Sequence, residues 1–150
     1  MEGVFKKLNY KGQGKVHILN APSSFEPELL VLEDQAEIVT RAEGDVHFAL
    51  GFVLTQDQVD AFAHSIGPKL EGDAICWLAY PKKSSKKYSS DINRDAGWDA
   101  LGDYQLEPVR QVAIDEDWSA LRFRKVDFIK DFKRKFGALS KEGKKRSKGQ

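Results

Sequence analysis

Three short apolar runs constrain the fold of this chain more than any other feature. They read KVHILN (15–20), DVHFALGFVL (45–54) and AICWLAYP (74–81), and polar, glycine-containing or proline-containing turns bound them. A continuous apolar run of this length is typical of a strand that is covered on both faces. The pattern therefore predicts a parallel sheet with helices on both sides.

Helical spacing fills the stretches between these runs. Thr55 is a residue type that caps helix N-termini, and apolar side chains recur at helical intervals after it. Ser23 or Ser24 could cap an earlier helix, and Ser90 or Asp91 a later one. The helices predicted in this way cover residues 22–32, 55–70 and 90–106.

Two further strand-like stretches, 107–115 and 118–126, are joined by a very short link. So short a connection predicts an antiparallel hairpin. An alternating stretch at 36–42 predicts one more strand near the start of the chain. The predicted fold class is α/β: a three-layer sandwich with a mostly parallel sheet that ends in an antiparallel hairpin.

Charge is distributed unevenly along the chain. From Lys125 onward ten Lys and Arg face three Asp and Glu, a net of +7, and because the whole chain carries +1 the preceding residues carry −6. Such a basic end could attract nucleic acid or could simply be a solvated terminus. We expect one domain over residues 1–139, with a helix at 127–139, and a basic, disordered tail over residues 140–150.

The sequence carries few signals of a particular enzyme class. Cys76 is the single cysteine, which excludes an intrachain disulfide and a cysteine-based metal cluster. His17 and His47 lie in predicted strands, where a hydrogen-bonded core histidine is the usual role, and no metal-ligand spacing or G-x-S-x-G motif is present. No apolar run approaches the ~20 residues of a membrane-spanning helix. We therefore expect a cytoplasmic protein with no metal site and no membrane partner.

A loop rich in lysine and serine, residues 82–91, follows the apolar run that ends at Pro81. In open α/β sheets ligands bind beyond the carboxyl ends of the strands, and the NAPSSF loop (20–25) follows another strand at that edge. We predict that the two loops converge on a small anionic ligand of the phosphate or nucleotide type. Serine hydroxyls and backbone N–H groups would cradle it, and ammonium groups would supply charge. A flexible, solubilising loop is the alternative. The residues predicted to form this site are Asn20, Pro22, Lys82, Lys83, Ser84, Ser85 and Lys86.

Charged residues on either side of the predicted hairpin extend the site. Arg94 could grip a phosphate or carboxylate with two parallel hydrogen bonds. The carboxylates of the turn 115–117 could divide acid and base roles in a cleft, or could be exposed turn residues. Arg122 could form a salt bridge with Glu116 or Asp91. The predicted ligand site is completed by Asp91, Arg94, Glu116, Trp118 and Arg122.

The layout resembles the class I methyltransferase-like Rossmann fold, whose sheet ends with a reversed hairpin. KGQGKVHILN (11–20) resembles the approach to the first strand of that fold, and LEGDAICWLAYP (70–81) resembles its helix–glycine–strand segment. The motifs LNAP, PKKSSK, DINRD and VRQVAIDEDWSALRF also resemble those of a small bacterial family without a settled role. The resemblance implies the methyltransferase-like fold.

The loop after the first strand departs from the methyltransferase pattern. Methyltransferases that use S-adenosylmethionine carry a glycine-rich loop at this position, whereas Pro22 here removes a donor and fixes φ. Glu43 is the only acidic residue near the end of the second strand that could bind a ribose. The first hypothesis is therefore an anion-binding Rossmann-like domain without an intact glycine-rich loop and with no cofactor identified. A divergent S-adenosylmethionine-dependent methyltransferase is the alternative, and nucleic-acid contact through the basic tail is the third.

Overall fold

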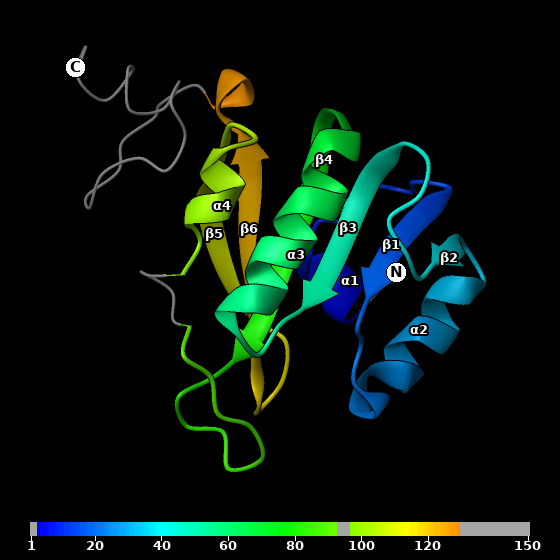
Figure 1. Cartoon of the computed structure of the whole chain (residues 1–150). Helices are drawn as coiled ribbons and strands as arrows, with labels where there is room; N and C mark the ends of the chain where they lie inside the picture. Colours follow the sequence, from blue (N-terminus) through cyan, green and yellow to red (C-terminus); the bar gives the residue numbers. More distant parts are fainter. Residues whose placement is uncertain (1–2, 93–96, 130–150) are drawn as a thin grey trace.

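The computed structural model describes residues 3–92 and 97–129, and these residues form a sheet of six strands in the order β2-β1-β3-β4-β6-β5 (Figure 1). Strands β2, β1, β3 and β4 are parallel, whereas β6 pairs antiparallel with both β4 and β5. The predicted parallel sheet with a terminal hairpin is therefore confirmed. The strands are β1 (Lys15–Leu19), β2 (Glu37–Val39), β3 (Val46–Phe52), β4 (Leu70–Pro81), β5 (Leu106–Ala113) and β6 (Trp118–Lys125).

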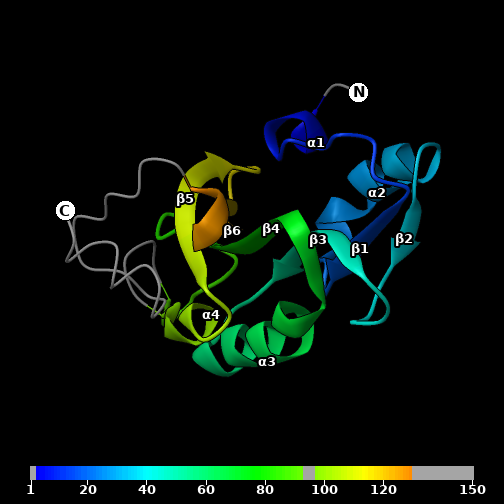
Figure 2. The same cartoon turned by 90° about the horizontal axis from the view of Figure 1, so that it is seen from above.

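Helices lie on both faces of the sheet, which makes the three layers that were predicted (Figure 2). Helices α1 and α2 lie on one face, and α3 and α4 lie on the other. The α-helices are α1 (Val4–Lys7), α2 (Glu26–Glu33), α3 (Gln56–Ile66) and α4 (Asp99–Gly102), and the 3-10 turns are η1 (Ser23–Phe25), η2 (Gly67–Lys69) and η3 (Val126–Phe128).

Each face of the sheet has its own apolar core. On the α1 face, Phe48, Leu50 and Trp77 are fully buried, and the Trp77 Nε1 donates to the backbone carbonyl of Leu8 at 2.8 Å. This bond fixes the short N-terminal helix segment to the sheet, because a buried indole N–H needs an acceptor. On the α3 face, Trp98 is a core residue that packs between aromatic neighbours.

The predicted cap of α3 is confirmed, but the predicted caps of α2 are wrong. The Thr55 hydroxyl accepts from the backbone N–H of Gln58 at 3.2 Å. Ser23 and Ser24 cap nothing, because the chain first makes the η1 turn and α2 starts after Phe25, whose side chain is apolar.

The helix predicted over 90–106 is also wrong in its extent. Residues 93–96 lie outside the described part, and among the described residues of this stretch only α4 is helical. The Ser90 hydroxyl donates to the carbonyl of Leu54 at 2.7 Å and accepts from the N–H of Ile92 at 3.1 Å. Of the two strand histidines, His17 is buried and its Nε2 donates to the carbonyl of Glu43 at 2.8 Å, whereas His47 is exposed at the start of β3.

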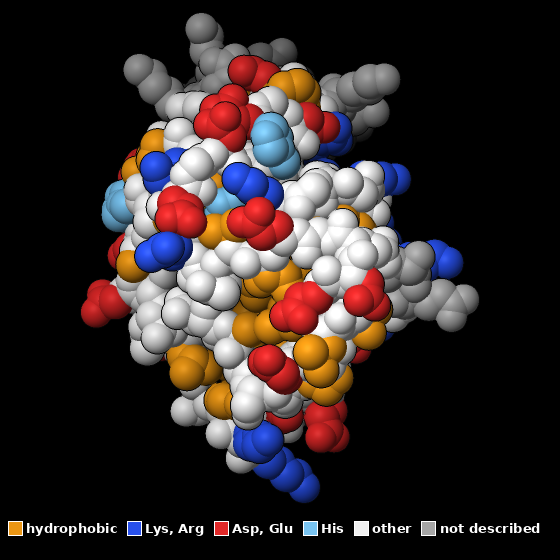
Figure 3. Space-filling view, turned by 90° about the vertical axis from the view of Figure 1, so that its right-hand side faces the viewer, with side chains coloured by type: hydrophobic (Ala, Val, Ile, Leu, Met, Phe, Trp, Pro, Cys, Tyr) orange, Lys and Arg blue, Asp and Glu red, His pale blue; other side chains and the backbone are white. Residues whose placement is uncertain are grey.

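The side of the molecule that carries α2 and β2 shows acidic side chains around a group of hydrophobic ones (Figure 3). Leu30 and Val31 of α2 are 58% and 50% exposed. None of the described helices combines the length and the apolar character needed to span a bilayer. The predicted helix at 127–139 and the tail at 140–150 fall almost entirely outside the described residues.

Candidate functional site

The order of the strands reverses between β1 and β3, which places the expected ligand position at the carboxyl ends of these two strands. Asn20, directly after β1, is exposed and has φ 60°. This left-handed conformation is one that glycine adopts freely and that asparagine tolerates better than most residues. The chain therefore keeps a sharp turn after β1 without using glycine.

The N-terminus of α2 is poorly suited to binding a phosphate. The N–H of Phe25 already donates to the carbonyl of Pro22 at 2.9 Å, and Pro27 has no N–H. Glu26 and Glu28 lie in the first turn, where their negative charge complements the helix dipole. A phosphate at this end would meet two carboxylates and fewer free donors than an ordinary helix N-terminus offers.

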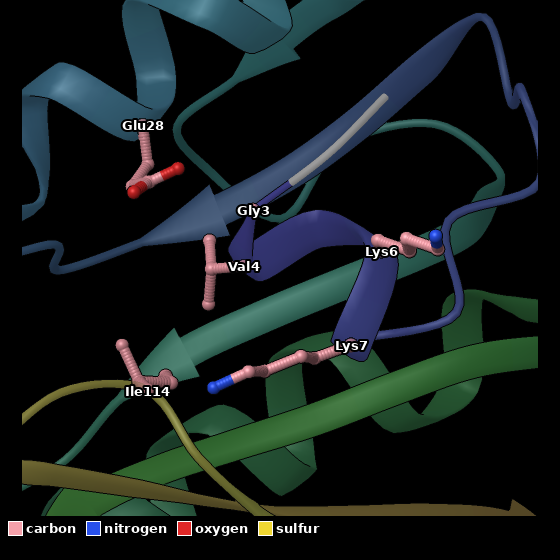
Figure 4. A pocket seen from close by; sticks show the side chains of 6 residues that line it. All are labelled: Gly3, Val4, Lys6, Lys7, Glu28 and Ile114. Atoms are coloured by element: carbon pink, nitrogen blue, oxygen red, sulfur yellow. The ribbon is translucent and has the colours of Figure 1, made fainter.

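A cavity of about 640 Å³ opens beside the ends of β1 and β3, between α1, α2 and the turn after β5 (Figure 4). Ligand pockets commonly have volumes of roughly 300–1,000 Å³. Lys7 and Glu28 reach toward the cavity from opposite sides of Val4, whereas Lys6 points away. The cavity, which we call the switch-point pocket, is lined by Gly3, Val4, Lys6, Lys7, Glu28 and Ile114.

The charges of the switch-point pocket are held in place by its backbone. The Lys7 Nζ donates to the carbonyl of Ala113 at 3.2 Å, which directs the ammonium group toward the β5–β6 turn. The Glu28 carboxylate lies next to Gly3, which has φ 93°. A Cβ atom built on this glycine would lie 3.5 Å from the Glu28 Oε2. An ammonium group and a carboxylate thus flank an apolar floor formed by Val4 and Ile114.

Sequence reasoning did not find this pocket. Its lining comes from three segments far apart in the chain, and the four residues from Gly3 to Lys7 that contribute to it carry no recognisable motif. The only local signal was an apolar pair followed by two lysines at the start of the chain.

A row of aromatic side chains runs along the same edge of the sheet. Ring centroids are 5.0 Å apart between Phe25 and Phe52, 5.1 Å between Phe52 and Trp118, and 4.9 Å between Trp118 and Tyr88. The row connects the loop after β1 with the lysine-serine loop. The Trp118 Nε1 is buried and has no hydrogen-bond partner within the described residues.

The lysine-serine loop is anchored on the β5–β6 turn. The Ser85 hydroxyl donates to the Asp117 Oδ1 at 2.8 Å and accepts from the N–H groups of Lys87 and Tyr88 at 3.3 and 3.1 Å. The N–H of Lys82 donates to the carbonyl of Asp117 at 2.8 Å. No hydrogen bond or ion pair in the described parts of the chain links this loop to Asn20. Lys83, Ser84 and Lys86 are exposed, and Lys82 and Pro22 are half-buried.

The remaining predicted site residues are dispersed. The Asp115 Oδ1 accepts from the N–H groups of Asp117 and Trp118, so this carboxylate shapes the turn. Glu116 and Asp91 are exposed, and neither forms an ion pair with Arg122 in the described structure. The proposed salt bridge is therefore wrong, because Arg122 lies in the middle of β6, opposite Trp77 and away from the turn. Arg94 lies outside the described residues.

Comparisons with known proteins bear on the fold. No family model and no curated protein matches the sequence. Among solved structures, the pyocyanin biosynthetic protein PhzM matches 81% of this chain with a TM-score of 0.51 and 10% identity, and the chain spans about half (52%) of PhzM. The Methanococcus jannaschii fibrillarin pre-rRNA processing protein matches 77% of this chain with a TM-score of 0.49 and 12% identity, and the match covers 67% of that protein. The N-methyltransferase NodS from Bradyrhizobium japonicum WM9 matches 74% of this chain with a TM-score of 0.44 and 12% identity, and the match covers 73% of NodS. The chain has a methyltransferase-like Rossmann fold.

Proposed function

We propose that this chain is a methyltransferase-like domain whose switch-point pocket binds a zwitterionic ligand of the S-adenosylmethionine type. The observation that carries the proposal is the placement of opposite charges, Lys7 and Glu28, across an apolar floor at the ends of β1 and β3. Glu28 would pair with the ammonium group of an amino-acid ligand and Lys7 with its carboxylate, while Val4 and Ile114 would contact the aliphatic part. When bound, S-adenosylmethionine supplies an activated methyl group.

The two ends of this ligand fit the chain differently. For the amino-acid end, the pocket provides a counter-charge to each group: Glu28 for the ammonium and Lys7 for the carboxylate. For the nucleoside end, the single candidate carboxylate of the sequence, Glu43, is exposed and forms an ion pair with Arg41 at 2.9 Å. We therefore assign the amino-acid end to the switch-point pocket and give no residue a catalytic role.

Calorimetric titration with S-adenosylmethionine, methionine and adenosine tests the proposal. We expect S-adenosylmethionine and methionine to bind, and Glu28→Gln and Lys7→Met each to weaken both about tenfold, which corresponds to ~1.4 kcal/mol for one charge-assisted contact. Lys15→Met is the matched control, because Lys15 is exposed and lies at the opposite end of β1. The absence of heat with both ligands at millimolar concentration would refute the proposal.

A second candidate function is the binding of a phosphate- or nucleotide-like anion at the lysine-serine loop. It is supported by the Ser85–Asp117 bond, which holds the loop in place while the ammonium groups of Lys83 and Lys86 stay exposed. The combined change of Lys82, Lys83 and Lys86 to Ala should abolish binding of ADP measured by calorimetry. Unchanged affinity for ADP would remove this candidate. Nucleic-acid contact through the basic tail stays a prediction, because residues 130–150 lie outside the described part.

A further inference from the structure

Arg122 is an unusual charged residue in this fold. It lies in the middle of β6, it is half-buried, and its Nε atom is buried without a hydrogen-bond partner in the described residues. A guanidinium N–H that loses water without gaining an acceptor is costly, and such a buried polar atom in a native protein is commonly explained by a bound water, ion or partner. The Nε–H of Arg122 therefore calls for an acceptor that the described residues do not supply.

Two other arginines on the same strands surround Arg122. Arg110 lies directly opposite Arg122 on β5, and residues paired in this way have Cβ atoms about 4.5–5.5 Å apart on the same face of the sheet. Arg124 is two residues along β6, so its side chain also emerges on that face. Three guanidinium groups therefore share one face of the hairpin.

Two described carboxylates lie beside these arginines: Asp73, and the buried Glu107, which is paired with Arg124 across β5 and β6. Asp73 is the carboxylate that favours the charged form of Arg122, but Arg124 already binds it through Nε at 2.8 Å and Nη2 at 2.6 Å. Burial, together with the charges of Arg124 and Arg110, lowers the pKa of Arg122. Residues 130–150 contain nine Lys and Arg and only two Asp and Glu, so this segment adds positive charge.

The face of the hairpin that carries Arg110, Arg122 and Arg124 is accessible. It is the α1 side of the sheet, and no described helix covers β5 and β6 on that side (Figure 2). Arg110 is exposed, whereas Arg122 and Arg124 are half-buried. A ligand could therefore reach Arg122 from solvent while the sheet shields its other side.

We propose that Arg110, Arg122 and Arg124 form an oxyanion site that binds the phosphate group of a phosphorylated ligand. The planar guanidinium fork matches phosphate oxygens, and clusters of arginine are an arrangement that recognises phosphate in proteins. The phosphate can belong to a small metabolite or to a phosphorylated peptide. The site lies on the strands of the hairpin and is independent of the switch-point pocket.

Three probes distinguish the sources of the phosphate: inorganic phosphate, AMP and a phosphoserine peptide, each titrated into the full chain by ³¹P NMR. We expect at least one probe to bind saturably. Arg122→Gln and Arg110→Gln should each weaken that binding at least tenfold. Arg41→Gln is the control and should leave it unchanged, because Arg41 is an exposed arginine outside β5 and β6 that pairs with Glu43. Binding of AMP alone or of the peptide alone supports the site and identifies the source.

A thermal-unfolding measurement separates loss of binding from loss of folding. Saturating concentrations of the bound probe should raise the Tm of the native chain and of Arg41→Gln but not that of Arg122→Gln. Without any probe, Arg122→Gln should unfold at the same temperature as the native chain or a higher one, because it removes a half-buried charge without an acceptor. Failure of all three probes to bind saturably, or equal affinity in Arg122→Gln and Arg41→Gln, would overturn the proposal.

Discussion

Replacing Ser85 with alanine should release the lysine-serine loop from the β5–β6 turn. The Ser85 hydroxyl makes three hydrogen bonds, one donated to the Asp117 carboxylate and two accepted from the N–H groups of Lys87 and Tyr88. The half-buried residues Ser85 and Asp117 are 32 positions apart, so their bond joins two distant segments, beside the bond from the Lys82 N–H to the Asp117 carbonyl.

The magnitude follows from the type of bond. A hydrogen bond to a charged group contributes about 1.5–3 kcal/mol, and the two longer bonds to backbone N–H groups contribute less. We expect Ser85→Ala to lower the free energy of unfolding by about 1–2 kcal/mol, because water can reach part of the loop and replace some of the lost contacts. Asp117→Asn keeps the shape of the acceptor and removes its charge, so its effect should be smaller.

Urea unfolding of Ser85→Ala, Asp117→Ala and the double variant gives the coupling energy between Ser85 and Asp117. We expect a coupling of about 1 kcal/mol, accompanied by faster amide hydrogen exchange at Lys87 and Tyr88, whose N–H groups lose their acceptor. Ser89→Ala is the matched control, because this exposed serine lies in the same loop. Additive effects within about 0.3 kcal/mol, with unchanged exchange at both amides, would refute the anchoring role of Ser85.

Three further predictions concern the sheet. Gly51→Ala should destabilise the chain by about 1–3 kcal/mol in urea unfolding, because a Cβ would lie 2.4 Å from the Phe62 Cε2, whereas Gly14→Ala, with nothing within 4 Å, should be nearly neutral. Cys76 should react with a thiol reagent at pH 8 only as fast as the chain unfolds, because burial raises the pKa of its thiol to about 12. The thiol of the unfolded chain loses its proton at a lower pH than the buried thiol of the folded chain. The free energy of unfolding should therefore fall as the pH rises above 9, and it should fall less steeply in Cys76→Ala, which lacks the thiol. Asp73→Asn should tighten phosphate binding in the ³¹P titration, because it frees Arg124, and unchanged or weaker binding would contradict a role for Arg124.

The strands of this chain could be predicted because each apolar run carries its own signal of burial. Residues 45–54 are apolar on both faces, and β3 is indeed covered on both sides. The hairpin followed from the shortness of its link, and the cap of α3 followed from the side chain of Thr55. These features depend on neighbours within a few positions, which is the range over which a sequence pattern is informative.

The parts that were not predicted depend on partners far away in the chain. Ser90 resembles a helix cap, but its hydroxyl bonds to Leu54, which is 36 positions earlier. β4 begins at Leu70, before its apolar run, because the parallel pairing with Val46 extends the strand. The switch-point pocket likewise joins Glu28 and Ile114 to the first residues of the chain. No local spacing encodes contacts of this kind.

The turn after β1 bears directly on how a ligand would be recognised. A glycine at this position adopts a positive φ easily and has no Cβ. Asn20 also has a positive φ, but it carries a Cβ. The backbone can therefore make the turn but cannot approach a ligand as closely, and Pro22 offers it no N–H. In the proposed site, the charged side chains of Lys7 and Glu28 would recognise the ligand in place of backbone donors. Because exposed charges are screened by salt, affinity at the switch-point pocket should fall as ionic strength rises, more steeply than for a ligand held by backbone N–H groups.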